Sequence, residues 1–257
     1  MTKPTIAVVP GAWIPEQFYS PYIHTLEKAG FETRYAEYPS LEPQNPLTAD
    51  CATDAKAVRS ILEPLVETEG KDVVLVMHSY GSMPGCAAAK GLSKTERLRS
   101  GKLGGILGMI LFSAFLVPEG LSCAGIQGGM LPPWIMLDNP APGLNVPKDP
   151  INVFAADFDQ GLAKKTEQEL KPHSSLAFFS PQPPTACADP AFKDRLAYVV
   201  ATNDLAVPKD AQYAMIAGTG QEWKIKEVPQ SHCAPFKVDL DESVKIVGEF
   251  IEAFQGV

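Results

Sequence analysis

Short apolar runs alternate with segments of helical periodicity along the chain, and this alternation constrains the fold more than any other feature of the sequence. Several of the runs are continuously apolar, which is typical of parallel strands buried on both faces. Strands are expected at residues 5–9, 31–37, 73–77, 105–112, 196–201 and 223–228. Helices are expected at residues 16–28, 49–67, 83–92, 211–217 and 242–254. The pattern predicts an α/β protein with a mostly parallel central sheet and helices on both faces.

Residues 117–189 interrupt this alternation with many prolines and one helix-like stretch at residues 158–170. A structureless loop of that length is not expected inside a compact domain. We therefore expect a core domain of residues 1–116 and 190–257, and an inserted cap of residues 117–189 over the carboxyl edge of the sheet.

Ser79 lies where the apolar run 73–77 breaks into a turn of small residues followed by a helix. A serine on such a turn exposes its hydroxyl at the carboxyl edge of the sheet, as in the nucleophile elbow G-x-S-x-G. Gly81 keeps the second glycine of this pattern, whereas Met77 replaces the first. The motif alone is weak evidence, because serine next to glycine is common in turns.

A serine hydroxyl becomes nucleophilic when a base removes its proton. Of the four histidines, His232 follows a late strand in a loop, which is where a base can reach the elbow. His24 is expected within the first helix, and His78 directly precedes the serine, so both are interpreted as structural. His173 belongs to the predicted cap and is a candidate for the pocket or for the cap surface.

Asp204 follows the expected strand 196–201, one strand before His232. Catalytic triads on this kind of sheet run in the chain order Ser, Asp, His. An ordinary turn or helix-capping aspartate is the alternative interpretation of this residue.

An oxyanion hole needs two backbone N–H groups aimed at the developing negative charge. Tyr80, directly after the serine, and Ala12, in the loop after the first strand, are the expected donors. Several residues of that loop and of the predicted cap are candidates for lining a substrate pocket. They are Gly11, Trp13, Met130, Trp134, Phe154, His173 and Phe178. Most apolar cap residues could instead simply attach the cap to the core.

With these residues assembled, the chain resembles the α/β-hydrolase fold superfamily over nearly its whole length, and most of all the branch of plant methylesterases and hydroxynitrile lyases. Residues 9–13 (VPGAW) are similar to the HGAW segment, and residues 77–81 (MHSYG) to G-H-S-x-G. Residues 198–208, 231–236 and 171–175 are similar to the acid strand, the histidine loop and a cap segment of that branch. The resemblance implies a triad of Ser79, His232 and Asp204.

The expected function is hydrolysis of a small apolar carboxylic ester or lactone through an acyl-enzyme. A serine at the elbow excludes epoxide hydrolases and haloalkane dehalogenases, which need an aspartate there. Cyanohydrin cleavage is not expected, because Cys233 stands where the resembling lyases have lysine and Gly11 where they have threonine. Two alternatives stay open: a non-hydrolytic lyase or cyclase of secondary metabolism that uses the same pocket, and a receptor-like ligand-binding protein.

The net charge of −8 over 257 residues argues against nucleic acid or an anionic membrane as a partner. No phosphate loop, dinucleotide fingerprint or metal-ligand spacing is present, so neither a cofactor nor a metal is expected. The five cysteines contain no C-x-x-C pair and are expected to be reduced, mostly buried thiols of a cytoplasmic protein. The N-terminal apolar run is too short for a signal or a membrane span. Monomer and homodimer are both compatible with the sequence.

Overall fold

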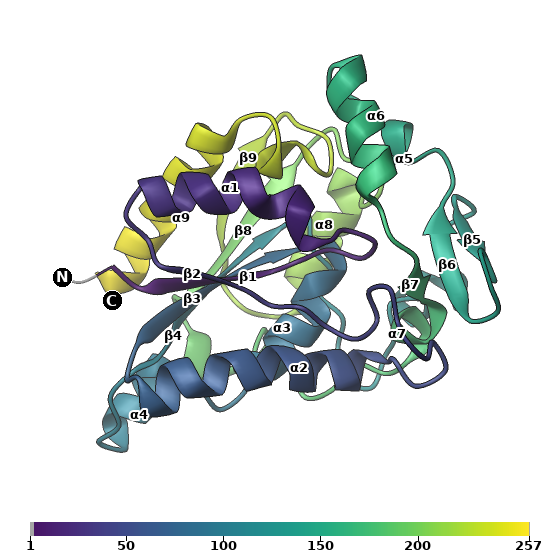
Figure 1. Cartoon of the computed structure of the whole chain (residues 1–257). Helices are drawn as coiled ribbons and strands as arrows, with labels where there is room; N and C mark the ends of the chain where they lie inside the picture. The colour runs from purple at the N-terminus through teal and green to yellow at the C-terminus, as the bar shows by residue number, and fades with distance from the viewer. Residues whose placement is uncertain (1–2, 257) are drawn as a thin grey trace.

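A six-stranded sheet, in which every neighbouring pair of strands is parallel, forms the centre of the computed structural model, which describes residues 3–256 (Figure 1). The spatial order of the strands is β2-β1-β3-β4-β8-β9. They span Thr5–Val9 (β1), Thr33–Tyr35 (β2), Asp72–His78 (β3), Gly105–Phe112 (β4), Leu196–Ala201 (β8) and Lys224–Val228 (β9). The inner strands β1, β4 and β8 are buried along their whole length, as expected of parallel strands covered on both sides.

Helices cover both faces of this sheet, so the predicted α/β architecture is confirmed. On one face α1 (Glu16–Lys28) packs against α9 (Leu240–Gln255), and on the other α2 (Cys51–Glu63) packs against α3 (Ser82–Ala89) (Figure 1). Two further helices are α4 (Lys94–Arg99) and α8 (Lys209–Gly218). The helix expected at 49–67 is divided, because Pro64 has no N–H to continue α2 and begins a π-helical turn, Pro64–Thr68.

Residues 135–179 carry a second, smaller group of elements beyond the carboxyl end of β1, on the right of Figure 1. A small antiparallel sheet of strands β5, β6 and β7 is combined with three short helices. These elements are β5 (Ile135–Leu137), β6 (Leu144–Pro147), α5 (Pro150–Phe154), α6 (Gln160–Glu169), β7 (His173–Ser174) and α7 (Ser175–Phe179). Helix α6 matches the helix-like stretch of the sequence, whereas the small sheet was not expected. Residues 1, 2 and 257 of the predicted core lie outside the described part.

A disulfide between Cys86 and Cys187 corrects the expectation that all five cysteines are reduced. Cys86 lies on α3 and Cys187 in the segment before β8, 101 residues later, with their Cα atoms 5.8 Å apart. Sequence spacing gives no sign of this pair, because only the folded chain brings the two segments together. Cys51, Cys123 and Cys233 are free and buried.

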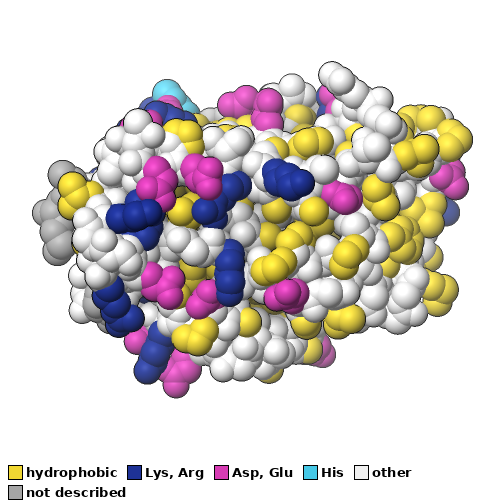
Figure 2. All heavy atoms as spheres, turned by 90° about the horizontal axis from the view of Figure 1, so that it is seen from below, with side chains coloured by type: hydrophobic (Ala, Val, Ile, Leu, Met, Phe, Trp, Pro, Cys, Tyr) yellow, Lys and Arg dark blue, Asp and Glu magenta, His cyan; other side chains and the backbone are white. Residues whose placement is uncertain are grey.

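The surface seen from below in Figure 2 carries positive and negative side chains close together rather than a field of one sign. Arg97 pairs with Glu67, and Lys71 pairs with Glu69 and Glu32. Among residues 3–256, no helix combines the length and the apolar character needed to cross a membrane.

Candidate active site

Ser79 lies on a sharp turn at the carboxyl end of β3, where the short turn Ser79–Gly81 leads into α3. Its φ of 53° is in the left-handed region, which costs a non-glycine residue roughly 1–3 kcal/mol. Gly81 makes the turn possible, since a Cβ there would overlap the carbonyl group of Pro10. The Ser79 residue is 6% exposed and lines a small cavity at this edge of the sheet.

Met77 replaces the first glycine of the elbow pattern without entering that cavity. Its side chain is fully buried and lies against Gly85 of α3, where a Cβ would overlap the Met77 sulfur. The sequence therefore accommodates a larger residue before the serine by having no side chain at position 85.

Asp204 and His232 are joined across the loops that follow β8 and β9. Oδ2 of Asp204 lies 2.7 Å from Nδ1 of His232, and both side chains are buried. Oδ1 of the same carboxylate accepts hydrogen bonds from the backbone N–H groups of Ala206 and Val207, at 2.8 and 2.9 Å. Asp204 therefore accepts hydrogen bonds within its own turn and also lies against the imidazole of His232.

A cavity of about 20 Å³ brings together four of the residues singled out by the sequence: Ser79, His232, Ala12 and Tyr80 all line it. Asp204 is connected to this cavity through the ring of His232. The volume is about that needed for one water molecule. The space beside the serine can therefore hold the reacting atoms of a substrate but not its body.

Aromatic rings form much of the remaining wall, including four predicted pocket residues, Trp13, Trp134, Phe154 and Phe178. The Trp13 ring stacks on that of Phe154 with 5.7 Å between centroids, and its N–H donates a 2.8 Å hydrogen bond to Oδ1 of Asn145. Asn145 belongs to β6, so the small antiparallel sheet holds Trp13 over the cavity.

The other three predicted pocket residues lie outside the cavity wall. Met130 is 75% exposed and follows Gly128 and Gly129, both of which have positive φ. His173 is fully buried behind the cavity wall, where its ring packs against those of Tyr80 and Phe178, and it belongs to a polar cluster described below. Gly11 lies next to the elbow, where a Cβ would approach the Ser79 Cβ to 3.1 Å.

His78, which the sequence indicated only as structural, links three loops around the site. Its Nδ1 accepts a 2.7 Å hydrogen bond from the hydroxyl of Tyr19, which in turn accepts one from the Gly11 N–H at 2.9 Å. Its Nε2 donates to the backbone carbonyl of His232 at 3.1 Å. Burial, and then the neighbouring His232, hold the pKa of His78 well below its usual value, so the ring is neutral and can donate and accept once each.

Tyr38 supports the loop in which Pro10 replaces the histidine of the HGAW segment. Its hydroxyl, 3.0 Å from the backbone carbonyl oxygens of both Pro10 and Gly11, donates to them. Together with Tyr19 it fixes the loop that carries Ala12. Tyr19 and Tyr38 thus hydrogen-bond to the backbone of the loop that contains Pro10.

A buried polar cluster lies on the other side of the elbow. The carboxylate of Asp54, on α2, accepts hydrogen bonds from the Tyr80 hydroxyl and from the backbone N–H and hydroxyl of Ser40. The Ser40 oxygen also lies 2.9 Å from Nε2 of His173. Burial raises the pKa of Asp54 to about 6 and lowers that of His173 to about 3. Sequence periodicity shows none of this, because the cluster joins segments more than a hundred residues apart.

The loop that carries His232 is hydrogen-bonded to two residues at and just after the end of α5. Asp157 accepts hydrogen bonds from the backbone N–H of Ser231, at 2.7 Å, and from its hydroxyl. The carbonyl of Phe154 accepts from the backbone N–H of Cys233 at 2.9 Å. The position of the imidazole therefore depends on α5 and the residues after it. Within residues 3–256, no group of three or more His, Cys, Asp or Glu side chains is arranged to hold a metal ion.

This combination of fold and site agrees with a family comparison. Residues 6–241 match the model of the alpha/beta hydrolase family, and the chain belongs to that family.

Two curated relatives are similar to this chain over most of its length. The alpha/beta hydrolase nvfD of Aspergillus novofumigatus (strain IBT 16806) is 27% identical over 261 residues, which cover 98% of this chain and 100% of the relative. The probable hydrolase R7 of Phoma sp. (strain ATCC 20986 / MF5453) is 27% identical over 250 residues, which cover 91% and 92%.

Solved structures share the fold at lower sequence identity. A pyrethroid hydrolase from Sphingobium faniae JZ-2 has a TM-score of 0.75 at 18% identity, with 98% of both chains covered. Polyneuridine aldehyde esterase has a TM-score of 0.71 at 14% identity, covering 96% of this chain and 99% of its own. The methylesterase MES16 from Arabidopsis has a TM-score of 0.66 at 16% identity, covering 96% and 98%. The α/β-hydrolase fold expected from the sequence is confirmed.

Proposed function

We propose that this chain is a serine hydrolase that cleaves a carboxylic ester or lactone of an apolar substrate through an acyl-enzyme. The observation that carries the proposal is the buried pair of His232 and Asp204, whose imidazole lines the same small cavity as Ser79. Names of the proteins that share the fold, an esterase, a methylesterase and a pyrethroid hydrolase, support ester cleavage as the reaction.

In this mechanism His232 removes the proton from the Ser79 hydroxyl as the oxygen attacks the substrate carbonyl. Asp204 holds the imidazole in one tautomer and stabilises its positive charge. The backbone N–H groups of Tyr80 and Ala12 stabilise the oxyanion, and losing one such donor typically costs about 10²–10³ in rate.

Collapse of the first tetrahedral intermediate breaks the bond to the alcohol, and His232 gives that oxygen the proton. A water molecule then attacks the acyl-enzyme, with His232 acting again as the base. The acid is released and the Ser79 hydroxyl is restored. For a lactone, the alcohol and the acid leave as one molecule.

Hydrolysis of p-nitrophenyl butyrate and of a panel of lactones tests this proposal, with the wild type beside Ser79→Ala. We expect turnover by the wild type and its loss in the variant, with an unchanged circular dichroism spectrum. Absence of turnover on every ester and lactone would contradict the proposal and favour a lyase, a cyclase or a receptor that uses the same pocket. Ester turnover that Ser79→Ala retains would contradict Ser79 as the nucleophile.

A further inference from the structure

A second hollow lies beside the small cavity and is far larger. It is a cleft of about 570 Å³, compared with about 20 Å³ around Ser79. Sites for small molecules typically occupy about 300–1,000 Å³. The cleft is therefore large enough for a small molecule, whereas the cavity beside the serine is not.

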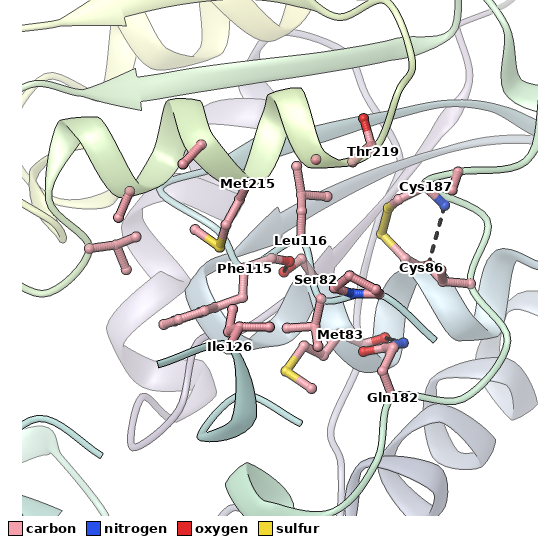
Figure 3. Close-up of a pocket in the computed structure, with 18 of the residues that line it drawn as sticks. Ser82, Met83, Cys86, Phe115, Leu116, Ile126, Gln182, Cys187, Met215 and Thr219 are labelled. Carbon is pink, nitrogen blue, oxygen red and sulfur yellow. Dashed lines mark hydrogen bonds between the residues drawn. A yellow bond between two sulfur atoms is a disulfide. The ribbon is translucent and has the colours of Figure 1, made fainter. Parts of the chain in front are cut away.

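The walls of this cleft are mostly apolar. Met83 and Cys86 come from α3, Phe115 and Leu116 from the segment after β4, and Met215 from α8, with their side chains gathered around one space (Figure 3). None of these five side chains carries a charge. The cleft is therefore suited to a hydrocarbon surface.

Among the described residues that line the cleft, the charged ones are Lys90 and Glu119, and both are exposed. Lys90 is already paired with Asp189, at 2.8 Å. A charged ligand would thus find no buried counter-charge among them, and a neutral ligand fits better.

The cleft lies directly beside the candidate active site. Phe115, Gln127, Ala206 and Val207 line both hollows. The backbone N–H of Phe115 donates to the carbonyl of Ser79 at 3.2 Å, so the shared wall is attached to the nucleophile turn itself.

Two links between distant segments hold one wall of the cleft together. The disulfide between Cys86 and Cys187 joins α3 to the segment before β8 along one wall (Figure 3). Near it, Nε2 of Gln182 donates a 3.0 Å hydrogen bond to the carbonyl of Met83. Both links join α3 to a segment about a hundred residues later in the chain, and so hold the two segments side by side.

We propose that this cleft binds the larger, hydrocarbon part of an uncharged ester whose carbonyl carbon lies at Ser79. The proposal rests on the hydrolase function proposed above and names its substrate class: neutral esters with one bulky or long apolar portion, acyl or alcohol. Short esters lack the hydrocarbon portion that would make contacts in the cleft.

A substitution on α8 provides the test, with a matched control on the same helix. Ala214 is exposed and lines the cleft, so Ala214→Trp fills it without disturbing the core. Ala217 is also exposed on α8 but does not line the cleft, so Ala217→Trp is the control.

The ratio of kcat/KM for a long ester to that for its short homologue is measured in two series, p-nitrophenyl alkanoates and alkyl acetates. In the wild type we expect this ratio to rise up to about fourfold per methylene in the series that enters the cleft, from about 0.8 kcal/mol per buried CH₂. Ala214→Trp should lower the ratio at least tenfold, and Ala217→Trp should leave it at the wild-type value. Ratios unaffected by Ala214→Trp in both series would overturn the proposal.

Binding separates this proposal from the hydrolase function. In a Ser79→Ala background, the Kd of methyl decanoate is measured by calorimetry with and without Ala214→Trp. Binding that Ala214→Trp weakens at least tenfold supports the cleft as the ligand site even when no ester is hydrolysed. Binding that the substitution leaves unchanged contradicts it even when esters are hydrolysed.

Discussion

The hydroxyl of Tyr80 donates a 2.6 Å hydrogen bond to the buried carboxylate of Asp54. This bond ties α2 to the residue that directly follows Ser79 and whose backbone N–H is a proposed oxyanion donor. The Tyr80 side chain is fully buried, so its hydroxyl is confined to this contact. The position of the proposed donor thus depends on a carboxylate that never reaches the cavity.

Asp54→Asn should remove a pH dependence of stability. Burial raises the pKa of Asp54 from about 3.8 to about 6, so in this range the folded state binds a proton that the unfolded state has released. The stabilisation from that proton is fully present below about pH 4 and is lost as the pH rises through about 6, roughly 3 kcal/mol in all. Urea unfolding at pH 4 and pH 7 should show this change in the difference between wild type and variant. Parallel pH profiles would contradict it.

Gly85→Ala should destabilise the protein by about 1–3 kcal/mol, because the new Cβ overlaps the buried Met77 sulfur. The double variant Met77→Ala with Gly85→Ala should show a favourable coupling energy in a double-mutant cycle. Gly248→Ala is the control, since that position on α9 has open space and should gain about 0.5–1 kcal/mol. Equal effects of the two alanine substitutions would refute the packing argument.

The disulfide between Cys86 and Cys187 makes the number of reactive thiols a direct readout. Alkylation of the oxidised protein under denaturing conditions should modify three cysteines, and five after reduction. Because the bond closes a loop of about a hundred residues, its loss in Cys86→Ala should cost roughly 2–5 kcal/mol of stability. Five alkylated cysteines without reductant would show that the bond is absent.

Asp204→Asn should separate the two roles of this side chain. Asparagine keeps an oxygen for the N–H groups of Ala206 and Val207 but loses the charge that faces His232. We expect kcat to fall about 10⁴-fold with little change in Tm. Asp204→Ala should lose activity to a similar extent and also lower Tm, because the turn loses both acceptors. A Tm unchanged in the alanine variant would contradict the structural role.

The sequence predicts the central sheet and the helices that cover it well, and the small antiparallel sheet poorly, for physical reasons. Strands β1, β4 and β8 have the expected bounds, because a parallel strand buried on both faces must be a continuous apolar run. Strand β7 has only two residues and leaves no periodicity to detect.

At the site, the order of Ser79, Asp204 and His232 along the chain was enough to single them out, because loops at the carboxyl ends of parallel strands meet at one edge. The partners of His78 and Asp54, by contrast, come from distant segments and carry no local pattern. His173 shows the limit most clearly: its place in the predicted cap left the pocket and the cap surface open, whereas the structure buries it in the interior, 2.9 Å from the Ser40 hydroxyl.

Covalent labelling tests the central claim, that Ser79 is a nucleophile activated by His232, most directly. The protein is incubated with a fluorophosphonate, and the adduct is located by intact mass and peptide mapping. We predict one adduct, on Ser79, that is absent in Ser79→Ala and forms far more slowly in His232→Ala. No adduct, an adduct on another residue, or labelling at the same rate without His232 would contradict the account.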